Sequence, residues 1–153
     1  NVIINDINRE RLDDLSSKLD VEIVMGDAIF DLDMDIYAPC ALGATVNPET
    51  INRLKCDIIA GAANNQLANE YRDGEMCMEK DICYAPDFLI NAGGLINVYS
   101  EIKGYDRAHA LGRTEEIYNT TLEILKEAEL LNITTHTAAL RIAKKRISAK
   151  RVS

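Results

Sequence analysis

The sequence has 153 residues, of which 47% are hydrophobic and 27% charged; this suits one folded domain with an apolar core and argues against a disordered chain. Its 17 basic and 25 acidic residues give a net charge of −8, which repels a phosphate backbone and argues against a nucleic acid partner. The cysteines form no CxxC pair and there are two histidines, so no metal site is indicated.

The first five residues indicate that this chain is the later part of a longer protein. Residues 1–5 (NVIIN) have the composition of a buried strand with no segment leading into it. We therefore expect that a preceding segment has been removed. No charged and apolar leader opens the sequence, and no apolar run approaches the ~20 residues that a membrane span needs. A cytoplasmic, reducing location is expected, with the cysteines buried as small apolar side chains.

Short apolar runs alternate with helical stretches in the first half of the chain. Strands are expected at residues 2–5, 21–25, 35–38, 57–60 and 82–85, and helices at residues 8–19, at 48–54 and in the polar stretch after residue 60. This alternation is typical of βαβ units and a parallel sheet. The first four runs are apolar throughout, which predicts strands covered by helices on both faces.

The pattern changes after Pro86, where only helices are expected: residues 92–102, 106–131 and 135–151. The long middle helix is indicated by apolar residues at three- and four-residue spacings that a six-residue step interrupts, namely Leu111, Ile117, Tyr118, Leu122 and Leu125. No repeat or linker interrupts the chain. The prediction is one α/β domain with a helical extension from about residue 92.

Asp6 directly follows the first expected strand. An acidic side chain at the end of a parallel strand can accept hydrogen bonds from both hydroxyls of an adenine ribose. It can equally be a turn former or a residue that precedes a helix, here the one expected from residue 8. The Gly-rich loop that would decide between these readings belongs about twenty residues earlier, before this sequence starts.

Three further strand ends carry residues suited to a ligand, and ligands of such sheets bind at the carboxyl ends of strands. In residues 35–45, Pro39 and Gly43 can stop the strand and let the backbone approach a ligand, or belong to an ordinary connection to a helix that Asn47 caps. Residues 61–67 (GAANNQL) and 90–98 (INAGGLINV) offer amides and a glycine pair, although Asn91 can also be a helix cap. No nucleophile and base pair is apparent, and neither histidine has an evident catalytic partner.

Five segments together carry a resemblance: residues 3–6 (IIND), 35–45 (DIYAPCALGAT), 60–67 (AGAANNQL), 84–98 (YAPDFLINAGGLINV) and 104–111 (GYDRAHAL). In this order they closely resemble the NAD-binding domain of the Glu/Leu/Phe/Val dehydrogenase family, and its leucine-type members in particular. The resemblance implies a Rossmann-like, doubly wound parallel sheet, truncated at its N-terminus. It also implies the family's reaction, in which the enzyme uses NAD as the oxidant to deaminate an L-amino acid to a 2-oxo acid and ammonia.

The resemblance also assigns residues to roles. It implies that Asp6 binds the adenosine ribose and that Asn91 lies at the nicotinamide and the substrate. The cofactor positions implied in all are Asp6, Cys40, Ala41, Leu42, Asn64 and Asn91. Leu95 and Val98 correspond to positions that face the substrate side chain. An aliphatic Val98 leaves a distal carboxylate without a partner, which disfavours glutamate and favours a branched-chain substrate.

The family's Gly-rich loop, catalytic and carboxylate-binding lysines and catalytic aspartate cannot be matched in this sequence, so there is no catalytic residue to assign. This chain by itself is expected to have no dehydrogenase activity. The full-length protein, with an N-terminal domain, is expected to form homo-oligomers. The sequence leaves two alternative functions: an S-adenosylmethionine-dependent methyltransferase, in which the amide-rich segments have no role, and a non-catalytic interaction or regulatory module.

Overall fold

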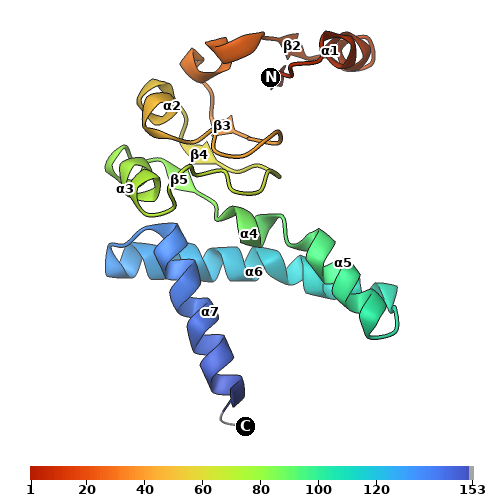
Figure 1. Ribbon diagram of the computed structural model, residues 1–153, viewed down its shortest axis with the longest axis vertical. Coiled ribbons are helices and arrows are strands. Elements are labelled where there is room, and N and C mark those ends of the chain that lie inside the picture. The colour runs from red at the N-terminus through yellow and green to blue at the C-terminus, as the bar shows by residue number, and fades with distance from the viewer. Residues whose placement is uncertain (152–153) are drawn as a thin grey trace.

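The computed structural model describes residues 1–151, with side chains to residue 150 (Figure 1). Its strands are β1 (Ile3–Ile4), β2 (Glu22–Ile23), β3 (Ile36–Tyr37), β4 (Ile58–Ile59) and β5 (Cys83–Tyr84). Its helices are α1 (Arg9–Ser16), the 3-10 helix η1 (Gly26–Asp31), α2 (Pro48–Arg53), α3 (Arg72–Glu79), α4 (Asp87–Ile90), α5 (Gly93–Ile102), α6 (Arg107–Leu131) and α7 (Thr135–Arg151).

All strand pairs are parallel, as predicted from the alternation of strands and helices. β1 pairs with β2, and a second sheet has the order β3-β4-β5. The strands are shorter than the apolar runs suggested, but backbone bonds continue just beyond them: the Val24 N–H donates to the Ile4 oxygen at 3.0 Å. The Ala60 N–H donates to the Tyr37 oxygen in the same way. The fold class is thus α/β and Rossmann-like, with a helical extension.

Helices cover one face of the β3-β4-β5 sheet within residues 1–151, so the expectation of cover on both faces is not met there. The two connections, β3-α2-β4 and β4-α3-β5, cross in the same direction and place α2 and α3 on the same side (Figure 1). Tyr37 and Ile59 point to that side and are buried. Ile36 and Ile58, one residue earlier, point to the other side and are 54% and 37% exposed.

The C-terminal half is built on α6, which packs against α4, α5 and α7 (Figure 1). Its junction with α7 is a left-handed turn at Asn132, and Ile124 and Ala128 form a small core there with Ala138, Ala139 and Ile142 of α7. The Thr135 hydroxyl donates to the backbone oxygen of Tyr84 at 2.6 Å, which ties α7 to β5. None of the described helices is both long and apolar enough to span a membrane.

Local signals explain several helix ends. Asn47 caps α2, which was one of the two roles considered for its segment, and forms a capping box with Thr50; Asp106 caps α6. α1 ends near Ser16, earlier than the predicted residue 19, where the hydroxyls of Ser16 and Ser17 bond to backbone oxygens of the preceding turn. η1 and α4 were not predicted, because such short helices show no apolar periodicity.

Candidate functional site

The carboxyl ends of β3, β4 and β5 meet at one edge of the sheet because the strands are parallel. The segments that leave them, residues 38–45, 60–67 and 85–92, are called here the strand-exit loops. Those after β3 and β4 run side by side beyond the sheet (Figure 1). Backbone bonds join them: the Ala63 N–H donates to the Pro39 oxygen at 3.0 Å, and the Ala44 N–H donates to the Asn65 oxygen at 2.6 Å.

Two glycines allow these loops to come so close. A Cβ added to Gly43 would lie 2.5 Å from the backbone oxygen of Asn64, and one added to Gly61 would clash with the backbone of Pro39. Such contacts are too short for any side chain. Gly43 was expected to let the backbone approach a ligand; in the structure, the space beside it is filled by the neighbouring loop.

Asn64 and Asn91 lie together, although 27 positions separate them. The Asn91 Nδ2 donates to the Asn64 Oδ1 at 2.6 Å and lies 3.5 Å from the backbone oxygen of Ala63. Asn91 is not the cap of α5, whose first turn follows Ala92 and receives no side-chain bond. The expectation that Asn91 caps the helix after it is therefore wrong; Asn91 ends α4 through its backbone, and its side-chain amide bonds within the strand-exit loops.

Gln66 and Asp87 connect the loops after β4 and β5, and neither residue was among those expected at the site. Gln66 is fully buried, and its backbone N–H donates to the Asp87 Oδ2 at 2.9 Å. The other Asp87 oxygen accepts the N–H of Phe88 at 2.6 Å. The sequence carried a weak signal for Gln66, since a glutamine beside the apolar Leu67 is a candidate for a buried hydrogen-bonding residue.

The three residues expected along the cofactor, Cys40, Ala41 and Leu42, form the exposed tip of the loop after β3. Leu42 is 88% exposed. Their side chains are not held by the core, and the loop presents its backbone at the same edge of the sheet as Asn64. This arrangement suits contacts to a ligand through backbone groups.

Asp6 follows β1, in the other sheet, and is half-buried. Its Oδ1 accepts the backbone N–H of Asn8 at 2.7 Å, so Asp6 does form the turn before α1 that was considered as an alternative role. The second carboxyl oxygen is not part of that turn. Asn5, the residue before it, joins the ends of β1 and β2 by donating to the backbone oxygens of Val24 and Gly26 at 2.8 and 2.9 Å.

Leu95 and Val98 lie three residues apart on α5 and share one face of that helix. They are 73% and 53% exposed, so they form an open apolar surface that begins one turn beyond Asn91. A Cβ added to Gly94 would meet nothing within 4 Å. Close packing within the described residues therefore gives no reason for a glycine at position 94, and the helix backbone there is accessible.

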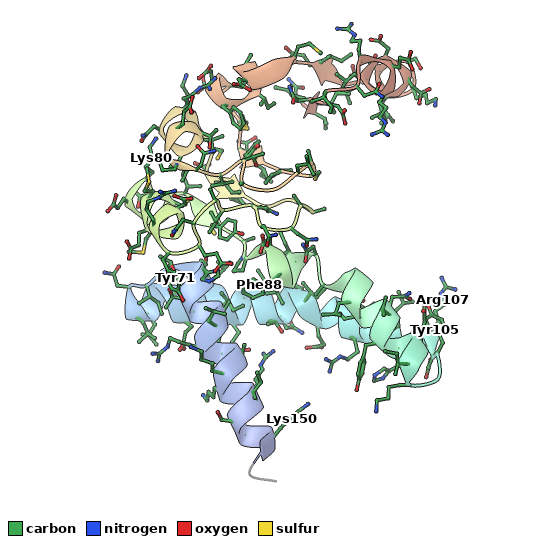
Figure 2. The ribbon with its side chains drawn as sticks, viewed as in Figure 1. Tyr71, Lys80, Phe88, Tyr105, Arg107 and Lys150 are labelled. Carbon is green, nitrogen blue, oxygen red and sulfur yellow. The ribbon has the colours of Figure 1, made fainter. Side chains whose placement is uncertain are left out.

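The histidines do not join this site. His109 is exposed on α6. His136 is buried at the start of α7, with edge contacts to the rings of Tyr71 and Phe88, which Figure 2 shows at the junction between the sheet and α6. Its Nε2 lies 3.6 Å from a carboxyl oxygen of Glu70. His136 thus holds secondary-structure elements together, as a packing histidine.

Burial favours the neutral form of three titratable groups on α3 and β5. Burial raises the pKa of the Tyr84 hydroxyl and, less strongly, that of the Cys83 thiol. Burial also raises the pKa of the Cys77 thiol to about 12. At neutral pH these groups are not nucleophiles. The strand-exit loops therefore offer neutral amides and backbone groups, which can orient a ligand by hydrogen bonding.

The sequence profile of the glutamate/leucine/phenylalanine/valine dehydrogenase family matches residues 3–152. The chain is 48% identical over 150 residues to leucine dehydrogenase of Thermoactinomyces intermedius. The aligned residues make up 98% of this chain and 41% of the relative. It is 44% identical over 147 residues to L-tryptophan dehydrogenase of Nostoc punctiforme, covering 96% of the chain and 42% of the relative.

A crystal structure of L-tryptophan dehydrogenase from Nostoc punctiforme superposes with a TM-score of 0.93 at 44% identity, covering 96% of this chain and 44% of that one. The same backbone arrangement therefore occurs in a solved dehydrogenase. The chain spans about two fifths of the length of the curated relatives that it matches.

Proposed function

Since the chain belongs to the glutamate/leucine/phenylalanine/valine dehydrogenase family, we propose that it is the NAD-binding part of an amino acid dehydrogenase that acts on branched-chain L-amino acids. The observation that carries the proposal is the contact of Asn64 with Asn91 at the carboxyl edge of a parallel sheet. Neutral amides at that edge are suited to the carboxamide and ribose of a nicotinamide nucleotide.

The residues present fit NAD. The tip of the loop after β3 (Cys40, Ala41 and Leu42) lines the cofactor through backbone groups, and the Asn64 and Asn91 amides orient its nicotinamide end. Asp6 keeps one carboxyl oxygen outside its turn with Asn8, and that oxygen accepts from the adenosine ribose. A 2′-phosphate would meet this carboxylate, which favours NAD over NADP. NAD, when bound, supplies the acceptor for the hydride of the amino acid.

The exposed apolar surface of Leu95 and Val98 faces the substrate side chain. Neither residue can donate a hydrogen bond to a second carboxylate, so glutamate would bury a charge without a partner. A leucine, valine or isoleucine side chain would instead cover the apolar surface of Leu95 and Val98, and the apolar surfaces of both substrate and protein would be removed from water. Relatives of similar identity are named for leucine, tryptophan and phenylalanine, and we propose that the bulk of Leu95 selects the smaller aliphatic substrates.

The described residues orient ligands, and the proton transfers of the deamination belong to parts of the protein outside them. We infer that the full-length enzyme resides in the cytoplasm as a homo-oligomer. Its substrate cleft lies between this part and an N-terminal domain. This chain by itself then has no dehydrogenase activity.

Calorimetric titration with NAD tests the proposal on the full-length protein and on this chain. The full-length protein should bind NAD saturably, and NADP much more weakly. The chain alone should bind NAD weakly, because the loop and helix N-terminus that hold the phosphates in such folds supply much of the anchoring. A full-length protein that binds neither nucleotide and oxidises no amino acid would contradict the proposal. The variant Asn91→Leu, which removes the amide but keeps the volume, should weaken NAD binding in the full-length protein.

A further inference from the structure

Gln66 is a buried polar residue whose side chain folds back onto its own loop. It is 0% exposed, and its Nε2 donates to the backbone oxygens of Gly61 at 2.6 Å and Ala63 at 3.0 Å. These two carbonyls flank the start of the segment that presents Asn64. Both amide hydrogens are thus used to hold the backbone before that residue in one conformation.

The backbone of Gln66 bonds to the loop after β5 and to the residue that follows the loop after β3. Its oxygen accepts the N–H of Val46 at 3.0 Å, just beyond the loop after β3, and its N–H donates to the Asp87 carboxyl group at 2.9 Å. Asp87 begins α4, and its backbone oxygen accepts the N–H of Asn91 at 3.0 Å. A chain of bonds therefore runs from Gln66 to both asparagines.

The orientation of the amide is determined by its partners. Two carbonyl oxygens face Nε2, so a rotated side chain would place oxygen against oxygen. In the observed orientation, Oε1 is buried and makes no hydrogen bond within the described residues. An apolar residue would fill this space without burying an unpaired oxygen. What glutamine adds at this position is therefore the two hydrogen bonds that its Nε2 donates.

We propose that Gln66 is a positioning residue that holds Asn64 and Asn91 where they contact the nicotinamide end of NAD, which rests on the proposed function. The oxygen of Ala63 is the shared element: it accepts from Gln66 at 3.0 Å and lies 3.5 Å from the Nδ2 of Asn91. When Gln66 loses its donors, the loop between Gly61 and Asn64 is released, and the two asparagine amides are no longer held together.

The test compares Gln66→Met and Gln66→Glu with the unmodified full-length protein. Methionine keeps the volume and removes both donors. Glutamate keeps the shape but sets a carboxyl group against two carbonyl oxygens, so it should be the more harmful variant. Losing two hydrogen bonds should raise the KM for NAD by roughly 5-fold to at most about 150-fold and lower kcat. The KM for the amino acid should change less.

Amide hydrogen exchange in the absence of NAD measures the positioning independently of the proposed function. Exchange in residues 60–67 and 85–92 should become faster in Gln66→Met. Thr134→Val is the matched control, because Thr134 is also buried but bonds to Thr137 in the first turn of α7. It should lower the melting temperature and leave both the exchange of these loops and the KM for NAD unchanged.

The outcomes separate the two ideas. Unchanged exchange in Gln66→Met overturns the positioning role, and faster exchange with an unchanged KM for NAD overturns its link to the cofactor. An unmodified enzyme that does not bind NAD refutes the proposed function, while the exchange result still decides the positioning. If Gln66→Met fails to fold, Asp87→Asn tests the same connection from the other loop, since it removes one of the two carboxyl oxygens that accept backbone N–H groups.

Discussion

Gly43 in the loop after β3 lies against Asn64 in the loop after β4, so closely that a Cβ on Gly43 would lie 2.5 Å from the backbone oxygen of Asn64. Gly43→Ala should therefore push the two loops apart. Overpacking of this kind costs about 1 to 3 kcal/mol of stability, and NAD binding to the full-length protein should weaken as Asn64 moves. Chemical denaturation and calorimetric titration measure the two effects.

Gly112→Ala is the control for the Gly43 prediction. Gly112 lies within α6, and an added Cβ there meets nothing within 4 Å. Alanine should raise the free energy of unfolding by about 0.5 to 1 kcal/mol, because it restricts the unfolded chain and favours helix. An equally harmless Gly43→Ala would show that the strand-exit loops tolerate separation.

Asp6→Ser combined with Ile7→Arg should move the cofactor preference of the full-length enzyme towards NADP. The change removes the carboxylate that repels a 2′-phosphate and adds a cation at a fully exposed neighbour. Steady-state kcat/KM with NAD and with NADP measures the preference. Asp20→Ser removes an exposed acid elsewhere and controls for the loss of one negative charge. A ratio that does not change in the double variant would remove Asp6 from the ribose site.

The full-length enzyme should oxidise L-leucine, L-valine or L-isoleucine far better than L-glutamate, and phenylalanine poorly. The reason is the hydrocarbon surface of Leu95 and Val98, where each methylene that is properly filled is worth roughly 1 to 3 kcal/mol. Val98→Ser should raise the relative activity on polar substrates, whereas Val98→Ala, which changes size without adding a hydroxyl, should not. Values of kcat/KM across these substrates decide it, and glutamate as the preferred substrate of the unmodified enzyme would refute the role of Val98.

Stability should fall in alkaline solution because the buried Cys77 has a pKa raised from 9.0 to about 12. A raised pKa in the folded state stabilises the protein below pH 9 and the effect is lost between pH 9 and 12, since the unfolded chain releases the proton first. The loss is at most about 1.4 kcal/mol per pH unit for one such thiol. Cys77→Ala should reduce the slope of unfolding free energy against pH.

The order of the helices and strands could be predicted from the sequence because it depends on residues that are close together along the chain. Apolar runs alternate with helical stretches, and Asn47 and Asp106 cap their helices through residues two or three positions away. The parallel arrangement then follows, because short helical crossovers leave few other ways to join such strands. The same local patterns did not predict η1 and α4, because these helices are too short to show a helical spacing of apolar residues.

Contacts between distant segments were decided by the tertiary structure. Three contacts join residues that come together when β3, β4 and β5 align: the Asn64–Asn91 pair, the bond of Gln66 to Asp87 and the contact of Gly43 with the next loop. The sequence placed amides and glycines at strand ends but left open whether they serve a ligand, a cap or packing. Only the folded edge distinguishes these roles, because a hydrogen bond forms between atoms that are close in space, however far apart their residues lie along the chain.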